Sequence, residues 1–494
     1  MHIKDWVQTR IRQDEIDRYK EESEKDFIDD ELIESCLDGM REPDVAYVRQ
    51  IIAKSLRIET LSLRETAALL YVKDPVLIAE MEEAAIRIKK FVYDNRIVTF
   101  APLYLSSKCV NSCRYCSFRA ENGEMERRIV PRDELKKEVQ TLAGEIGHKR
   151  LIVVYGEHPD SDIGYIVDTV KEIYGSHFTT RKGSGQIRRV NINAAPMSIG
   201  DLKRLKEVGI GTYQVFQETY HKKTYRQVHP QNTLKGNYDW RLYTMHRAFD
   251  AGIDDVGIGA LFGLYDWRFE VMGLISHTHE LERRFGVGPH TISFPRLEPA
   301  SNAPLATESK YLVNDEDFKH AVLTLRLAVP YTGMILTARE DAPLRRRILP
   351  LGITQTDAST KIGLGAYSRD SQEQDFKRQQ FVIGDSRSLD EVVRDMAEMG
   401  FITSFCTAGY RCGRTGNKIM DMLKCGTEGK FCKLNAIITY REWLDDFASE
   451  ETRRTAEPLI QKEIREVREQ NPDMFDMLMA YYEKTAQGSR DLYF

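Results

Sequence analysis

The sequence predicts an α/β protein: a TIM-type (β/α)8 barrel of parallel strands with helical extensions at both ends. Three observations support this prediction. From about residue 97, short apolar runs alternate with amphipathic runs of ten or more residues over about 280 residues. Residues 1–90 instead show charged, helical patterns, and helical patterns return after residue 385. We therefore expect a helical N-terminal region (1–90), a barrel (91–385) and a C-terminal domain (386–494).

The expected elements can be placed in order along the chain. Before the barrel, apolar residues recur at helical spacing in 65–70 and 76–81. The first barrel strand is expected at 97–100, and the run 135–146 then repeats its apolar residues at steps of 4, 3 and 4, as on one helix face. The next strand is expected at 151–155. Further strands are expected at 190–192, 213–216, 256–258, 291–294 and 334–336.

The composition is that of an ordinary soluble globular protein. The 494 residues are 41% hydrophobic and 30% charged, which suits a large core under a solvated surface. The 76 acidic residues exceed the 71 basic ones, so no basic excess is available to neutralise nucleic-acid phosphates. No apolar stretch is long enough to span a membrane, and the first residues carry charges where a secretory signal needs an apolar run. We expect a cytoplasmic protein with no nucleic-acid or membrane partner.

The eight cysteines are unevenly distributed. Cys36 stands alone, whereas the other seven form one group at 109–116 and a second group at 406–432. A reducing compartment disfavours disulfides, so clustered thiols there indicate metal binding. The two groups are therefore the first candidates for functional sites.

The first group, Cys109, Cys113 and Cys116, has the spacing Cys-x3-Cys-x2-Cys and follows the first barrel strand. Three thiolates this close can hold three irons of a 4Fe-4S cluster and leave the fourth iron open for another molecule. A structural zinc site is the alternative, but zinc usually takes four ligands, and no histidine lies nearby in the sequence. A loop at the C-terminal end of a strand is also where barrel active sites lie.

This spacing, with the aromatic Tyr115 before the third cysteine, is similar to the signature of the radical SAM enzymes. The resemblance implies that the open iron binds S-adenosylmethionine (SAM) and that its cleavage releases a 5′-deoxyadenosyl radical. Gly156 and Glu157 end the second strand, where the superfamily has a Gly-Glu element that meets SAM. Asn191 and Asn193 end the third strand and share one face, so they are further candidate SAM contacts. A Glu or Asn at a strand end is also a common cap or turn former.

Longer segments extend the likeness to one family, the radical SAM tyrosine lyases, with a hydrogenase-maturing branch (HydG) and a thiamine-synthesising branch (ThiH). The resemblance covers roughly residues 57–448, and the last third of the barrel resembles the biotin/thiamin-synthesis-associated region. It implies cleavage of the Cα–Cβ bond of L-tyrosine to p-cresol and dehydroglycine. In the hydrogenase branch, a second cluster converts dehydroglycine to carbon monoxide and cyanide; the thiamine branch lacks that cluster. The segments that resemble the family are 101–105, 216–221, 254–266, 286–293 and 404–408.

The C-terminal tail departs from the hydrogenase branch, which carries Cys-x2-Cys-x22-Cys. Cys406 and Cys432 fill the outer positions, but Gly409 stands in the middle and has no side chain to bind a metal. Two other thiols, Cys412 and Cys425, lie between them. We expect the four thiols to hold an auxiliary iron–sulfur cluster with altered ligation, and a cluster closed by four cysteines would have no open iron. A four-thiol zinc site and a tail of buried free thiols are the alternatives.

The resemblance also suggests residues for the substrate and the second cluster. Arg339, at a late strand end, matches an arginine of the family, and Arg296 is the second candidate for pairing with the tyrosine carboxylate. Either could instead form a structural ion pair. Gln217 and Glu218 end another strand and are candidate contacts of SAM or substrate. His277 matches a histidine that contacts the auxiliary cluster in the hydrogenase branch, with a helix-surface role as the alternative.

The function we expect is therefore that of a radical SAM carbon–carbon lyase acting on tyrosine in hydrogenase cofactor maturation. One alternative is a 2-iminoacetate synthase-like paralogue without carbon monoxide and cyanide formation, and a different aromatic amino acid such as tryptophan is a further substrate to test. Another is a non-catalytic iron–sulfur or zinc scaffold, which would give the Gly-Glu and Asn-x-Asn elements no purpose. The expected partners are tyrosine, an electron donor such as ferredoxin or flavodoxin, and other hydrogenase maturation proteins.

Overall fold

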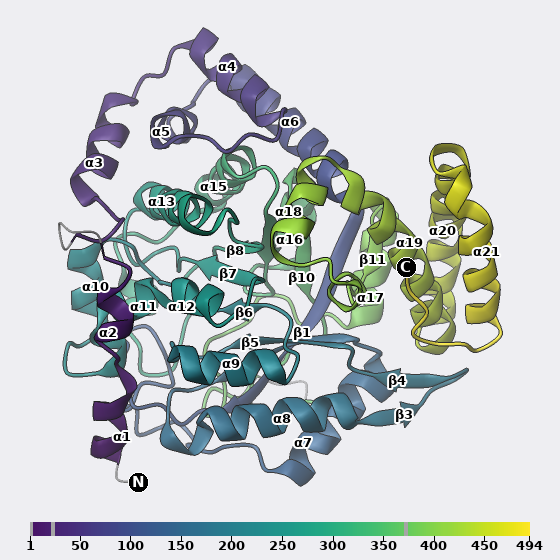
Figure 1. The fold of residues 1–494 in the computed structure, drawn as a ribbon, viewed down its shortest axis with the longest axis horizontal. Coiled ribbons are helices and arrows are strands. Elements are labelled where there is room, and N and C mark those ends of the chain that lie inside the picture. Colours follow the sequence, from purple (N-terminus) through teal and green to yellow (C-terminus); the bar gives the residue numbers. More distant parts are fainter. Residues whose placement is uncertain (1–2, 21–24, 370–373) are drawn as a thin grey trace.

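The computed structural model describes residues 3–20, 25–369 and 374–494. Eight parallel strands form a closed ring at its centre, since the last strand pairs with the first (Figure 1). The sequence-based prediction of a (β/α)8 barrel is thereby confirmed. In order around the ring the strands are β1 (Arg96–Ser106), β2 (Arg150–Tyr155), β5 (Arg189–Asn193), β6 (Tyr213–Gln214), β7 (Val256–Gly259), β8 (Thr291–Ser293), β9 (Gly333–Leu336) and β10 (Gln355–Asp357).

Helices follow the strands and cover the outside of the barrel. Several begin at a side chain that accepts a main-chain N–H of the first turn, as Asp162, Ser198 and Asn314 do. A small antiparallel hairpin of β3 (His177–Thr179) and β4 (Ser184–Gln186) lies outside the ring. The helices between the strands are α7 (Arg132–Val139), its π-helical continuation Gln140–Ile146, α8 (Ile163–Gly175), α9 (Ile199–Glu207), α10 (Lys222–Val228), α11 (Tyr238–Leu242), α12 (Thr244–Asp250), α13 (Trp267–Phe285), α14 (Leu305–Glu308), α15 (Asp315–Ala328) and α16 (Ala342–Ile348).

Strand β1 is the longest strand of the ring, and all eleven of its residues are buried. A strand of a parallel barrel faces the interior on one side and the helical layer on the other, so both faces are removed from water. Its C-terminal half pairs with β2, whereas its N-terminal end pairs with a further parallel strand, β11 (Ile402–Ser404). One strand thus connects the mouth of the barrel, where its C-terminal end lies, with the floor.

The N-terminal region is helical, as its charged periodicity predicted. Its last helix leads directly into β1, and α5 and α6 pack against α13 and α15 of the barrel (Figure 1). The first helix lies near the end of β2, with Arg10 donating to Asp201 at 3.1 Å. The helices are α1 (Ile3–Arg10), α2 (Asp14–Asp17), α3 (Asp30–Gly39), α4 (Val45–Ser55), α5 (Leu63–Leu70) and α6 (Pro75–Tyr93).

The C-terminal segment packs against the floor side of the barrel, beside β11 (Figure 1). A buried ionic cluster holds it there: Glu442 accepts from Lys149 at 2.7 Å and from Arg188 at 3.0 Å, and all three side chains are at most 2% exposed. These charges neutralise one another in a region that water does not reach. The helices of this segment are α17 (Leu389–Glu398), α18 (Gly416–Lys424), α19 (Thr427–Asp446), α20 (Glu450–Gln470) and α21 (Pro472–Ala486).

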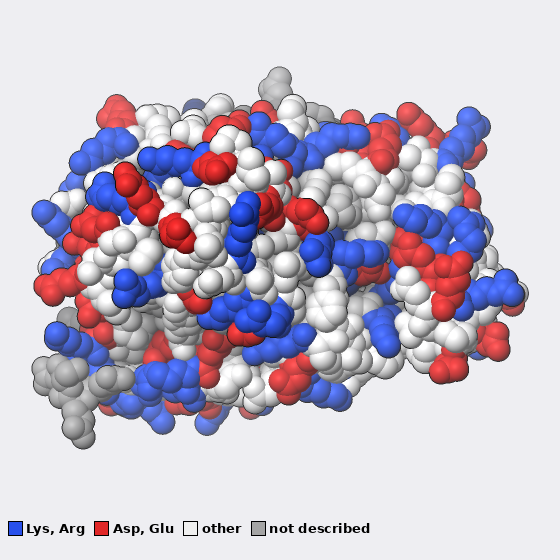
Figure 2. All heavy atoms as spheres, turned by 90° about the horizontal axis from the view of Figure 1, so that it is seen from above, with Lys and Arg blue, Asp and Glu red and all other residues white. Residues whose placement is uncertain are grey.

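The charges of the outer surface are mixed. Figure 2 shows basic and acidic side chains interspersed over the face in view, without a broad area of one sign. This pattern fits the small net charge of −5. Among the helices of the described residues, none combines the length and apolarity that crossing a bilayer demands.

Candidate functional site

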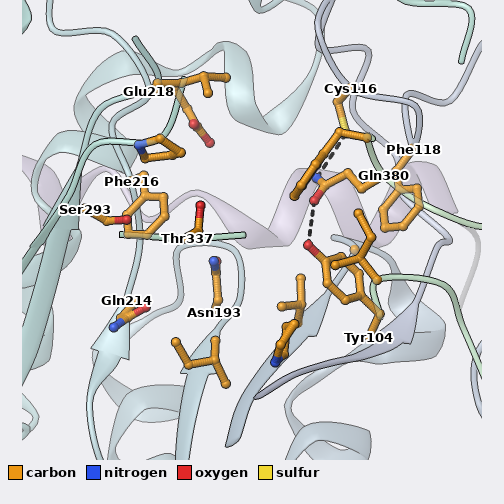
Figure 3. Close-up of a pocket in the computed structure, with 18 of the residues that line it drawn as sticks. Tyr104, Cys116, Phe118, Asn193, Gln214, Phe216, Glu218, Ser293, Thr337 and Gln380 are labelled. Carbon is orange, nitrogen blue, oxygen red and sulfur yellow. Dashed lines mark hydrogen bonds between the residues drawn. The ribbon is translucent and has the colours of Figure 1, made fainter. Parts of the chain in front are cut away.

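A cavity of about 230 Å³ opens at the mouth of the barrel and receives side chains from most of its strands. The thiols of Cys109, Cys113 and Cys116 all line it. They lie on the loop that follows β1, which is where their position after the first strand predicted them. Figure 3 shows Cys116 and Gln380 on one side of the cavity, facing Glu218 across it. A loop that turns three thiols into one cavity is the arrangement that an iron–sulfur cluster needs.

Amide groups point at two of these sulfurs. The Asn111 Nδ2 lies 3.7 Å from the Cys109 Sγ, and the Gln380 Nε2 lies 3.3 Å from the Cys116 Sγ (Figure 3). Burial raises the pKa of the Cys113 thiol to about 12. A buried thiolate needs such donors or a metal, and hydrogen bonds to sulfur are one of the means by which proteins tune iron–sulfur clusters.

Gly156 and Glu157 meet the cysteine loop at the end of β2. A Cβ at Gly156 would lie 2.2 Å from the Lys108 carbonyl oxygen, so only glycine allows the two segments to come this close. The Glu157 carbonyl accepts the Val110 N–H at 2.8 Å. Both residues line the cavity beside the three thiols, as expected for a Gly-Glu element that contacts SAM.

The two asparagines of β5 have different depths. Both point into the barrel, but only Asn193 reaches the cavity. Asn191 lies one pleat deeper, where its Oδ1 accepts the Thr212 N–H at 2.9 Å and the Arg189 Nε at 3.3 Å. Asn191 thus has structural contacts in the barrel interior, because strand geometry places alternate inward residues at different levels. Its expected contact with SAM stays a prediction.

Of the two neighbours Gln217 and Glu218, again only one reaches the cavity. Glu218 lines the cavity, and so does Phe216, whereas Gln217 does not line it and is buried elsewhere. Neighbouring residues of an extended segment point to opposite sides, which turns Gln217 away from this cavity. Its expected contact with SAM or substrate stays a prediction. Glu218 also has a φ of +71°, a strained conformation for a residue with a side chain, and such strain is concentrated at functional sites.

Two cations that were not singled out in the sequence hold Glu218. Lys235 donates to its carboxylate at 2.7 Å and Arg241 at 3.3 Å. Burial raises the pKa of Glu218, but these two cations outweigh it and the net pKa is lowered, so the carboxylate is charged. Both cations line the cavity and follow β6, and no motif in the sequence separates them from the other basic residues. Only the folded chain identifies them.

Tyr115 also lines the cavity, and its hydroxyl lies 2.8 Å from the His229 Nε2. Burial raises the pKa of Tyr115 well above its ordinary value and lowers the pKa of His229 well below its own. The pair is therefore neutral and fixes the ring beside Cys113 and Cys116. The aromatic residue before the third cysteine thus has a packing role at the thiols.

The two candidate arginines occupy different environments. Arg339 lines the cavity, stacks on Phe381 at 3.4 Å and forms no ion pair with a carboxylate among the described residues. Arg296 does not line the cavity; it pairs with Glu340, with Nε–O distances of 3.1 Å, and with Asp315 at 2.9 Å. Arg296 therefore forms the structural ion pair that was its alternative role, and its expected contact with the substrate stays a prediction. Arg339 remains as a guanidinium free to bind an anion in the cavity.

Glu298 adds a carboxyl group to the same wall of the cavity. Burial raises its pKa to about 7, and the nearby Glu340 adds to this shift, while Arg339 and Arg296 oppose it. This residue was not identified from the sequence. Its perturbed pKa within a cavity is the signal that marks it as a candidate functional group.

The second cysteine group lies at the opposite end of the barrel and is divided in space. Cys406 follows β11. Burial raises the pKa of Cys432 on α19, and the nearby Cys406 adds to this shift. Cys412 instead donates to the Phe494 carbonyl oxygen at 3.5 Å. Cys425 is exposed at the end of α18, where its sulfur contacts Thr427 at 3.0 Å. The four thiols that the sequence grouped together therefore do not converge as a set.

His277 lies apart from this second group. It is buried on α13, with its Nδ1 3.0 Å from the Tyr220 hydroxyl and its ring against Phe27 and His246. These contacts give His277 a packing role on α13, and its expected contact with an auxiliary cluster stays a prediction. His290 was not identified from the sequence; it lies near Arg150 and Arg189, which also lie near Cys406.

Comparisons with known proteins identify two family models that match this chain. Residues 103–272 match the model of the Radical SAM superfamily, and residues 293–402 match that of the Biotin and Thiamin Synthesis associated domain. The chain is 28% identical to the 2-iminoacetate synthase of Salmonella typhimurium over 350 residues, which are 71% of this chain and 88% of that protein.

Two solved structures are more similar. A crystal structure of HydG, described as a maturase of the [FeFe]-hydrogenase, is 43% identical, with a TM-score of 0.90 over 95% of this chain and all of that chain. The HydG maturase from Carboxydothermus hydrogenoformans is 34% identical, with a TM-score of 0.76 over 97% of this chain and all of that chain.

Proposed function

This chain belongs to the radical SAM enzymes of the HydG family, and from that premise we propose that it is a lyase that cleaves the Cα–Cβ bond of L-tyrosine. The products would be p-cresol and dehydroglycine. The observation that carries the proposal is the shared cavity: three thiols, the Gly156-Glu157 element and an unpaired arginine all face the same space at the mouth of the barrel. A barrel active site is expected at this end.

The cysteine loop fits the cofactor that the family implies. Cys109, Cys113 and Cys116 would hold a 4Fe-4S cluster, and Gly156 and Asn193 lie beside them to receive SAM. When bound, this pair supplies a 5′-deoxyadenosyl radical. The chain's own contribution is to position the ligands and to exclude water, since the cofactor carries the difficult chemistry.

The opposite wall supplies contacts for an amino acid. Arg339 offers a guanidinium to the carboxylate, because its charge has no carboxylate partner among the described residues. Glu298 lies near Arg339 and can accept a hydrogen bond from the substrate amino group. Glu218, held charged by Lys235 and Arg241, adds a fixed negative group that faces Cys116 across the cavity. Apolar lining residues such as Phe216 suit an aromatic side chain.

The wider role we propose is in the maturation of an iron–iron hydrogenase, with an electron donor of the ferredoxin or flavodoxin type. The likeness to two HydG maturases over nearly the whole chain supports it. A second candidate is a 2-iminoacetate synthase-like enzyme that releases dehydroglycine. Gly409 favours this candidate, because it removes one thiol of the tail motif of the hydrogenase branch.

The experiment is to incubate the anaerobically reconstituted protein with SAM, dithionite and tyrosine and to measure p-cresol by mass spectrometry. Formation of p-cresol is the expected result. Cleavage of SAM without p-cresol would contradict the substrate assignment but keep the radical SAM assignment. Replacing tyrosine by tryptophan in a parallel reaction checks whether another aromatic amino acid is preferred.

A further inference from the structure

The tail retains a compact group of metal-binding side chains at the floor of the barrel. Cys406 has a φ of +47°, a strained conformation that turns it out of β11, and its N–H donates to the Ser404 Oγ at 3.3 Å. The Cys432 thiol donates to the Glu428 Oε1 at 3.1 Å, and Arg96 and Cys406 lie close enough to interact electrostatically with it. One thiol and one carboxylate are therefore in direct contact, and the second thiol and a buried guanidinium interact electrostatically with them.

The carboxylate of Glu428 lies beside the missing position of the family motif. A Cβ placed on Gly409 would be 3.6 Å from the Glu428 Oε1, the oxygen that accepts from Cys432. There is room for that Cβ, since the next nearest atoms, both of Arg414, are 3.8 and 3.9 Å away. Glu428 thus presents an anionic oxygen to the space that a thiolate at position 409 would enter.

One oxygen of Glu428 is not satisfied by the protein. The side chain is 1% exposed; its Oε1 accepts from Arg414 Nε at 3.3 Å, whereas its Oε2 accepts no hydrogen bond among the described residues. The nearest cation, the Arg414 Nε, is 3.2 Å from that oxygen. This oxygen is ion-paired but accepts no hydrogen bond, so it keeps lone pairs available for a ligand.

We propose that Cys406, Glu428 and Cys432 hold an auxiliary iron–sulfur cluster, with the Glu428 carboxylate as the third protein ligand in place of the absent thiolate. Binding releases the protons of the two thiols, and the carboxylate keeps the number of anionic ligands at three. One iron is then left without a protein ligand. Cys412 and Cys425 are not ligands of this cluster, since the Cys412 thiol is hydrogen-bonded to the Phe494 carbonyl oxygen and Cys425 is exposed. This inference takes only one point from the proposed function, namely that the bound cofactor is an iron–sulfur cluster.

The test uses the full chain with Cys109, Cys113 and Cys116 replaced by alanine, so that iron bound at the mouth does not contribute. After anaerobic reconstitution with iron and sulfide, we expect about four iron and four sulfide per chain and an EPR signal on reduction. Glu428→Gln in this background keeps the size of the side chain and removes its charge, and we expect most of the iron and the signal to be lost. Adding Gly409→Cys to Glu428→Gln restores them, because it supplies the thiolate.

Glu463→Gln is the matched control, since Glu463 on the neighbouring helix α20 is also a buried, ion-paired glutamate, with Lys433 at 2.9 Å. It retains the iron. Full iron and an unchanged EPR signal in Glu428→Gln would overturn the proposal, as would a background protein that binds zinc or no metal. Because that background cannot cleave SAM, the outcome does not depend on tyrosine chemistry. Failure of the lyase assignment appears separately, as the absence of p-cresol from the unaltered protein.

Discussion

The two cysteine sites lie at opposite ends of one barrel and are built in different ways. At the mouth, three thiols come from a single loop after β1 and line one cavity. At the floor, the two thiols that approach each other, Cys406 and Cys432, come from a loop and a helix. The comparison teaches that cysteine spacing predicts a site when one loop carries all the ligands. Where separate elements bring the ligands together, thiols that are neighbours in sequence can lie apart.

The largest effect should come from removing a thiol at the mouth. We expect Cys113→Ala to abolish reductive SAM cleavage, because a cluster with only two protein thiolates at this loop is poorly held. The measurement is 5′-deoxyadenosine formed in the presence of dithionite. Cys425→Ala is the control, since this exposed thiol contacts only its own turn among the described residues, and it should cleave SAM as the unaltered protein does. Equal activity of the two variants would contradict the assignment of SAM cleavage to the thiols at the mouth.

A smaller effect is expected at the substrate wall of the mouth. Arg339→Met should lower kcat/KM for tyrosine about 10- to 100-fold, since a hydrogen bond to a charged group contributes about 1.5–3 kcal/mol. SAM cleavage without tyrosine should persist. The matched change Arg296→Met breaks the ion pair with Glu340 and should lower the free energy of unfolding instead. If Arg296→Met weakens tyrosine turnover more than Arg339→Met, the assignment of the two arginines is reversed.

The close approach of β2 to the cysteine loop can be tested through stability. Gly156→Ala should lower the free energy of unfolding by about 1–3 kcal/mol, because its Cβ would overlap the Lys108 carbonyl oxygen at 2.2 Å. Denaturant unfolding of the protein without cofactors measures this change. Gly175→Ala is the control, since a Cβ there has no neighbour within 4 Å. Similar values for both variants would mean that the loop moves freely away from β2.

The smallest effect concerns Glu298, whose pKa is raised to about 7 from its ordinary value of 4.5. Between these two pH values the folded state binds more protons than the unfolded state, so stability falls as pH rises from about 5 to 7. After allowance for solvent screening we expect a loss on the order of 1 kcal/mol. Glu298→Gln should remove this part of the pH dependence. Unfolding curves at pH 5 and pH 8 for both proteins measure it, and parallel behaviour would contradict it.

The barrel and the site at its mouth could be predicted because both depend on patterns among residues that are close in sequence. Alternating strand and helix periodicity defined the ring, and the loop of Cys109, Cys113 and Cys116 needed no long-range contact to be recognised. Strand-end motifs were less precise: Asn193 reaches the cavity but Asn191 lies one pleat below it. Such depth depends on register between strands, which the sequence alone does not specify.

Residues positioned by distant elements escaped prediction. Lys235 and Arg241 meet Glu218 only after the segment following β6 has folded back over the mouth. Glu428 could not be identified as a candidate ligand from the sequence, because only the packing of α19 brings its side chain close to Gly409. His277 was chosen by matching a family position, and only the fold shows that it is buried against Tyr220.

Strand β1 sets the distance between the two cysteine sites. Its end at Ser106 leads to the first cysteine loop, while Val98 pairs with Ser404, two residues before Cys406. The eight steps from Val98 to Ser106 span roughly 25 Å at the rise of a β-strand. Because a buried strand does not stretch, β1 fixes the distance between the mouth and the floor of the barrel. A spectroscopic distance between metal centres at the two ends should therefore stay constant whether or not substrate is bound.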